Sequence, residues 1–150
     1  MNLLRDFAAN RVLLCSVAAW FAAQLIKIII KAVIEKKLDL SLIMSSGGMP
    51  SSHSATVCAL CVAVAKLFTL SSPEFAIASV FSFIVMYDAA GVRRAAGEHA
   101  KIINRIVQDI AKGNNQYMEK NLKELIGHTP LQVSMGALLG VAVGLIFPVL

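Results

Sequence analysis

The chain has 150 residues, enough for one domain and too few for a clear second one. Apolar residues make up 57% of it and charged residues 15%, whereas soluble domains average about 45–50% and about 25%. This composition excludes an ordinary soluble fold. The net charge is +5, and the basic residues lie between apolar runs. This placement favours lipid headgroups over nucleic acid as the partner of the basic residues.

Four apolar helices are expected near residues 12–34, 53–70, 74–92 and 131–150, because a bilayer core requires about 20 apolar residues per helix. The first could be mistaken for a signal peptide, but its apolar pattern continues past Lys27 and Lys31. We therefore interpret it as a retained span. The sequence predicts an all-α, polytopic membrane helix bundle, with residues 1–150 forming a single integral-membrane domain.

The connections and cysteines are simple to interpret. Glycines and a proline precede the second helix, and Ser71, Ser72 and Pro73 predict a turn before the third. Cys58 and Cys61 form a CxxC pair inside an apolar run, without a second pair. A packing role, as small apolar side chains on one helix face, explains this pair better than metal binding or redox chemistry. The sequence predicts neither a metal site nor a cofactor.

The last third of the chain contains two further patterns. Residues 93–127 carry seven Lys or Arg, and Ile102, Ile103, Ile106, Val107 and Ile110 recur at helical spacing. We expect an amphipathic helix there, lying at the membrane interface or against the bundle. The fourth apolar helix carries a double GxxxG, which predicts close helix packing. A homo-oligomer would form through this face, made by Gly136, Gly140 and Gly144.

In an up-and-down bundle, one end of each of the four helices would lie on the same membrane face. Eleven of the fourteen Lys and Arg would lie on that face: 27, 31, 36, 37, 93, 94, 101, 105, 112, 120 and 123. Only Arg5, Arg11 and Lys66 would lie on the other. The positive-inside rule then places this face in the cytoplasm and both termini outside. The sequence thus predicts a multi-pass protein of the cell membrane with its ionisable residues at the cytoplasmic end.

The first polar cluster is GGMPSSHSA, residues 47–55. Proline and serines before an apolar run are ordinary helix-start residues, and that alone could explain the segment. A helix N-terminus with two hydroxyls, Ser51 and Ser52, is also a ready anion site. His53 beside it could donate a proton to the leaving group of a phosphate ester.

Two more clusters complete the candidate site. His128 lies between a glycine and the start of the last helix. It is either an interfacial histidine at a turn or a nucleophile that attacks phosphorus. Arg93 and Arg94 follow Asp88 at the end of the third helix. The arginines could extend to lipid headgroups, with Asp88 as their partner, or clamp a phosphate. His99, in a charged helix, is a weaker candidate.

Together these segments resemble a known family. GGMPSSHSA, IVMYDAAGVRRAAGEHA and ELIGHTPLQVSMGALLG are similar to the divergent, short branch of the type-2 phosphatidic acid phosphatase superfamily. That branch is also described as acid phosphatase/vanadium-dependent haloperoxidase-related. The likeness runs from Trp20 onward. It implies that Ser51 bonds phosphate, that His53 is the general acid and that His128 is the nucleophile.

The sequence departs from the superfamily motifs PSGH, SRxxxxxHxxxD and KxxxxxxRP at several positions. Ser52 replaces the glycine of the first, and Leu122 stands at the arginine position of the second. Gln132 stands where an aspartate would orient the nucleophile, so the imidazole loses a supporting charge. No KxxxxxxRP exists, but Lys27 and Lys31 lie in the corresponding region, and Arg93 and Arg94 could supply further cations.

The leading hypothesis is a membrane-embedded, metal-independent histidine phosphatase that hydrolyses a lipid or isoprenoid phosphate ester through a phosphohistidine. Its partners would be membrane lipids and a phosphorylated lipid substrate, a monoester or a diphosphate. The alternative is a catalytically inactive, phosphatase-like membrane protein that binds anionic headgroups or a partner, since a shared fold does not confer activity.

Overall fold

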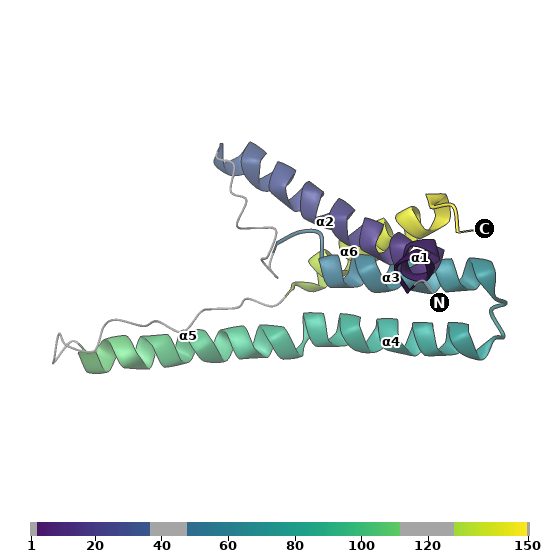
Figure 1. Ribbon diagram of the computed structural model, residues 1–150. Helices are drawn as coiled ribbons and strands as arrows, with labels where there is room; N and C mark the ends of the chain where they lie inside the picture. The colour runs from purple at the N-terminus through teal and green to yellow at the C-terminus, as the bar shows by residue number, and fades with distance from the viewer. Residues whose placement is uncertain (1–2, 37–47, 112–127, 150) are drawn as a thin grey trace.

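The computed structural model describes residues 3–36, 48–111 and 128–149, and these residues are mostly helical (Figure 1). The helices are α1 (Leu3–Ala9), α2 (Arg11–Glu35), α3 (Ser52–Leu67), α4 (Pro73–Ala90), α5 (Val92–Ala111) and α6 (Pro130–Ile146). The all-α prediction is confirmed for this part of the chain. The break expected after α5, at Gly113–Asn115, lies outside the described residues.

The helices begin where short polar side chains can cap them. The Asn10 side chain accepts a hydrogen bond from the Leu13 amide at 3.0 Å, and Ser72 accepts one from the Phe75 amide at 3.2 Å. Each cap satisfies an amide that has no partner within the helix. The Asn10 cap also separates α2 from the short α1, which the apolar pattern did not predict.

Two helical stretches are long and apolar enough to cross a bilayer, Arg11–Ile34 and Pro73–Gln108. The other two apolar helices are shorter than expected: α3 has 16 residues and α6 has 17. Helix α3 stops at Leu67 because Phe68 is already extended, and the turn to α4 follows. Helix α6 stops at Ile146 because Pro148 disfavours a helical conformation at the preceding residue, and Phe147 is extended.

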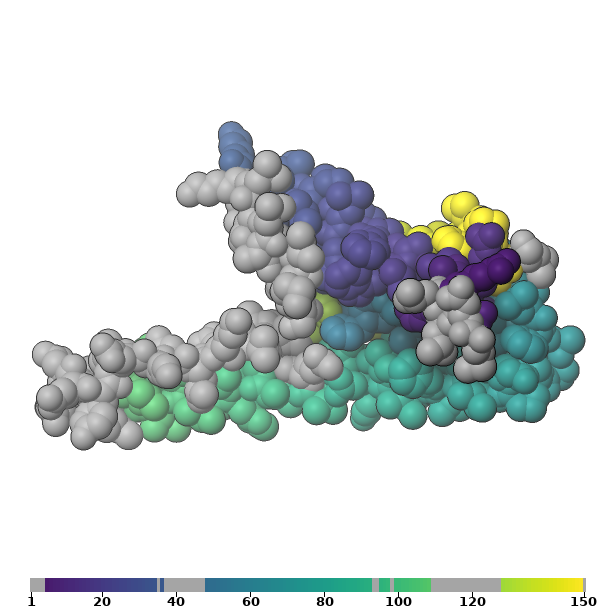
Figure 2. All heavy atoms as spheres, viewed as in Figure 1, coloured from purple at the N-terminus to yellow at the C-terminus, as the bar shows by residue number. Residues whose placement is uncertain are grey.

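Helix α3 lies at the centre of the bundle, in contact with α2, α4 and α6. Helix α2 also contacts α6, whereas α5 contacts α4, which it continues along nearly the same axis (Figure 1). In the space-filling view α5 projects past the rest of the bundle (Figure 2). The start of α3, the end of α4 and the start of α6 lie at the end of the bundle from which α5 departs.

The bundle buries small side chains and exposes large ones. Its core joins Cys15, Ala19 and Ala23 of α2 to Ala55, Ala59 and Ala63 of α3, all fully buried. Large apolar residues point outward instead, among them Phe21, Phe83 and Ile77, which are 60%, 67% and 70% exposed. Small residues between helices and large apolar residues outside are typical of a bundle surrounded by lipid.

The glycines of α6 continue this pattern. Gly136, Gly140 and Gly144 are buried against α3 of the same chain, and a Cβ at Gly136 or Gly140 would overlap the carbonyl oxygen of Ser51 or Ala55. The prediction of close packing is confirmed. The glycine face is filled by α3, so these residues offer no exposed surface for the homo-oligomer expected through them.

Lys66, near the end of α3, closes the far end of the bundle. Its Nζ donates hydrogen bonds to the carbonyl oxygens of Gly144, Leu145 and Phe147, at 3.3, 3.1 and 2.8 Å. These carbonyls belong to the last turn of α6, where the helix leaves acceptors without intrahelical partners and where a cation is favoured. Lys66 therefore caps α6 from a neighbouring helix.

Substituting Gly140 with leucine is expected to destabilise the bundle, because the Ala55 backbone cannot withdraw from the added side chain without separating α3 from α6. Overpacking of this kind costs about 1–3 kcal/mol or more. Thermal unfolding of the purified protein in detergent would measure the loss. The matched control is Leu138→Ala on the outward face of α6, where the side chain is 64% exposed. Equal unfolding temperatures for the two variants would contradict this packing.

Candidate functional site

The site is built where two polar turns meet. Ser51 caps α3 by accepting a hydrogen bond from the Ser54 amide at 3.3 Å, and its own amide donates to the Gln132 carbonyl oxygen at 3.0 Å. The second bond ties the start of α3 to the first turn of α6. Ser51 and Ser54 are fully buried here, so the segments PSSH and HTPLQ, far apart in sequence, form one polar cluster.

The two histidines of these segments face each other across the cluster. Their ring centroids lie 6.0 Å apart with the planes at 64°. His128 is 1% exposed and is the largest fully buried side chain in the described part of the chain, while His53 is half-buried. The amide of His128 donates to the Ala89 carbonyl oxygen at 3.1 Å, which anchors the residue to the end of α4.

Gln132 determines which nitrogen of His128 carries the proton. Its Oε1 accepts a hydrogen bond from the Thr129 amide at 3.1 Å, as part of the capping box of α6, and lies 3.2 Å from Nδ1 of His128. A backbone amide can only donate, so the shared atom is the carbonyl oxygen of the side chain. Nδ1 must therefore donate to it. In the neutral ring the lone pair is then on Nε2, the nitrogen available as a nucleophile.

Lys27 reaches the same cluster from the middle of α2. It is only 4% exposed, and its Nζ donates to the Ser52 hydroxyl at 2.6 Å. The Ser52 hydroxyl in turn donates to Oε1 of Gln24 at 3.2 Å. Ser52, which departs from the glycine of the superfamily motif, thus holds a buried cation at the positive end of α3. Both features favour an anion at this place.

Gln24 was not predicted as a site residue. It is 6% exposed and lies in the largely apolar helix α2, three residues before Lys27. That spacing places both side chains on one face of α2. A polar amide inside a membrane span is a functional candidate by default. The position of Gln24 within an apolar run could therefore have indicated it as a site residue.

The remaining predicted site residues either lie near this polar cluster or have side chains that the structure does not describe. Lys31 is half-buried one turn beyond Lys27, and Asp88 is half-buried on the last turn of α4, next to Ala89. Arg93 and Arg94 occupy the first turn of α5, but their side chains lie outside the described residues. Their proposed phosphate contacts stay predictions.

Gln132→Leu is expected to release the ring of His128, because leucine cannot accept the Nδ1 proton. Nitrogen NMR of labelled histidine should show Nδ1 protonated in the wild type and a mixture of tautomers in the variant. Gln132→Asp keeps an acceptor and adds a charge, so it should retain the tautomer and raise the basicity of the ring. His99, on α5, provides the control signal. A wild-type signal from Gln132→Leu would exclude this role.

A bundle of apolar helices that buries Lys27, Ser52 and His128 at one end describes a membrane protein with an internal polar site. Comparison with known sequences identifies the family. The chain belongs to the Divergent PAP2 family, whose sequence profile matches residues 8–143. It is 44% identical to the "Uncharacterized membrane protein YuiD" of Bacillus subtilis (strain 168), over 97% of this chain and 96% of that protein. No solved structure matches the chain significantly.

Proposed function

We propose that this protein is a membrane-embedded phosphatase that hydrolyses a lipid or isoprenoid phosphate through a phosphohistidine at His128. The observation that carries the proposal is the pair of histidines with rings 6.0 Å apart, beside a buried lysine. Membership of the Divergent PAP2 family supports the same chemistry. No metal or cofactor takes part in the steps proposed below.

In the first step Nε2 of His128 attacks phosphorus, and the bond from phosphorus to the leaving oxygen breaks. Protonated His53 gives its proton to that oxygen, so the leaving group departs as an alcohol. In the second step water attacks the phosphohistidine, neutral His53 accepts a proton from it, and the phosphorus–nitrogen bond breaks. Inorganic phosphate leaves, and both histidines return to their starting states.

Positive groups would stabilise the transition state of each step. Lys27 and the first turn of α3 lie beside the histidines and would bind the phosphoryl oxygens, where negative charge develops. Ser51 would contribute its hydroxyl, and Lys31, Arg93 and Arg94 would extend the cationic region toward the membrane surface. Asp88 would balance part of that charge.

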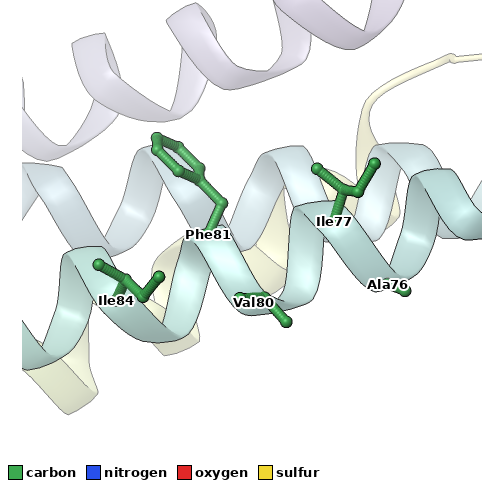
Figure 3. Close-up of a pocket in the computed structure, with 5 residues that line it drawn as sticks. All are labelled: Ala76, Ile77, Val80, Phe81 and Ile84. Atoms are coloured by element: carbon green, nitrogen blue, oxygen red, sulfur yellow. The ribbon is translucent and has the colours of Figure 1, made fainter.

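The apolar surface of α4 supports a substrate with a hydrocarbon chain. Ala76, Ile77, Val80, Phe81 and Ile84 form a shallow, open apolar surface along this one helix (Figure 3). Ile84 is one turn from Asp88 and five residues from Ala89, the residue that anchors His128. A lipid phosphate could therefore place its chain along α4 and its headgroup at the site.

One specific feature favours the alternative function. Gln132 is neutral, so the side chain that faces Nδ1 of His128 brings no negative charge to support a charged imidazole. A protein without turnover could still bind anionic headgroups through Lys27 and the start of α3. Phosphate release by purified protein from a panel of lipid phosphates and isoprenoid diphosphates separates the two functions. Headgroup binding without release would favour the binding protein.

We further propose that the chain crosses the membrane four times, with the site on the cytoplasmic face. A reporter fused after Leu150 is then expected on the non-cytoplasmic side, because the predicted up-and-down order of spans assigns eleven cations to the site end and three to the other. Alkaline phosphatase and green fluorescent protein fusions give opposite signals on the two sides. A cytoplasmic C-terminus would contradict the proposal, through either an inverted orientation or an odd number of crossings, in which case α5 is the first helix to reconsider.

A further inference from the structure

Helix α5 presents an uncovered apolar face. Ile102, Ile103, Ile106 and Val107 are 58%, 45%, 53% and 38% exposed. Their spacing of one, three and four residues places them on one side of the helix. Val92, 59% exposed and ten residues before Ile102, lies on the same side.

The opposite side of α5 contains small and polar residues that are buried. Gly97 and Asn104 are seven residues apart, two helical turns, and both are buried, with Asn104 only 6% exposed. A helix on a water-soluble domain has the reverse arrangement, with its apolar stripe inward and its polar side in water. The orientation of α5 instead suits an apolar environment on its outer side.

The charge of α5 indicates which apolar environment this is. Its sequence contains four Lys or Arg against one Glu and one Asp, a net charge of +2. Lys101 and Arg105, one turn apart, lie on the same side of the helix. Cations on the polar side of a helix whose other side is a wide apolar stripe are typical of helices that lie at the surface of an anionic bilayer.

The length of α4 and α5 constrains the geometry. The helical stretch Pro73–Gln108 has 36 residues, about 54 Å at about 1.5 Å per residue, whereas the hydrocarbon core is about 30 Å thick. If α4 crosses the membrane, a straight α5 would carry its isoleucines into water. Gly91 is the single residue between the two helices, and there the chain can change direction.

We propose that α5 lies on the bilayer surface, with its isoleucine face in the hydrocarbon boundary and Lys101 and Arg105 toward anionic headgroups. Figure 1 shows α5 in line with α4, so this position requires the chain to turn at Gly91 when the protein is in a bilayer. This position holds anionic lipids beside the end of α4, where the polar site lies. The inference concerns membrane contact and does not depend on phosphatase activity.

Spin labels on the full chain can test this contact. After replacement of Cys15, Cys58 and Cys61, single labels at Ile103, Ile106 and Gln108 are compared in vesicles of phosphatidylcholine with and without phosphatidylglycerol. Gln108 is the matched control, since it is exposed on the other side of α5. Labels at Ile103 and Ile106 should be several-fold less accessible to an aqueous nickel complex, and more accessible to oxygen, than the label at Gln108.

Anionic lipid should strengthen this difference, and Lys101→Gln with Arg105→Gln should remove that increase. A label at Ile84, on the outward face of α4, should be lipid-accessible throughout and reports insertion of the protein. Equal nickel accessibility at all α5 positions would overturn the proposal. Dipolar broadening at Ile106 that disappears on dilution with unlabelled protein would overturn it too, because a second copy would then cover the face.

Discussion

Replacing His128 with alanine is expected to abolish phosphate release and the covalent intermediate together. The variant keeps the backbone bond to Ala89 but loses the nitrogen that attacks phosphorus. The wild-type protein, quenched during turnover of a labelled lipid phosphate, should carry phosphate that is labile in acid and stable in base, as phosphoramidates are. His128→Ala should carry none, and its phosphate release should fall to the rate without enzyme.

The His53→Ala variant tests the role of the general acid separately from that of the nucleophile. Loss of a general acid typically costs about 10²–10⁴-fold in rate, and the loss should be largest for alkyl phosphates, whose leaving oxygen needs a proton. Formation of the phosphoenzyme from an activated aryl phosphate should be nearly insensitive, because that leaving group needs no proton, whereas hydrolysis of the phosphohistidine still loses its base. His99→Ala, on the exposed part of α5, is the matched control and should behave as wild type. Full turnover by His128→Ala would refute the phosphohistidine.

Lys27→Met is expected to reduce kcat/KM for a lipid phosphate by about 10²–10³-fold, the usual effect of removing one preorganised donor from a developing anion. Methionine preserves most of the volume of the side chain but removes the cation that Ser52 holds beside the histidines. The unfolding temperature should be unchanged or higher, because burying a charge is costly and an apolar replacement relieves that cost.

The combination of lost activity and retained stability distinguishes a phosphate-binding lysine from a structural one. Lys36→Met, at the exposed end of α2, is the control and should alter neither quantity. The kcat/KM of Ser52→Ala should lie between those of Lys27→Met and Lys36→Met, because this variant keeps the lysine but loses the hydroxyl that positions it. A Lys27→Met protein that unfolds at lower temperature and turns over normally would make the Lys27–Ser52 bond purely architectural.

Most of the fold could be predicted because apolar run length and turn residues act locally. The starts of α2, α3, α4 and α6 agree with the predicted spans within one residue. The ends of α3 and α6 were wrong by three or four residues, because an apolar residue such as Phe68 or Phe147 continues the hydropathy pattern after the helix has ended. Helix α1 was missed because its capping residue, Asn10, carries no hydropathy signal.

The candidate site, too, could be predicted only in part from the sequence. That His53 and His128 would meet followed from the order of spans alone, and the structure brings their rings together. The partners of Lys27 could not be predicted, since they depend on how α2 rotates against α3. The role of Gln132 was underestimated, because the sequence showed the lost charge and not the amide oxygen that still faces Nδ1.

The small residues between α2, α3 and α6 also determine which substitutions the protein can tolerate. At positions such as Ala19, Ala59 and Gly140 there is almost no side-chain volume to remove. Harmful variants there can therefore only enlarge the side chain, and the truncations that empty a soluble core have little counterpart. Outward positions such as Phe83 and Leu138 should exchange freely among apolar types. A saturation mutagenesis profile of these helices would consequently rank side chains by size inside the bundle and by polarity outside it.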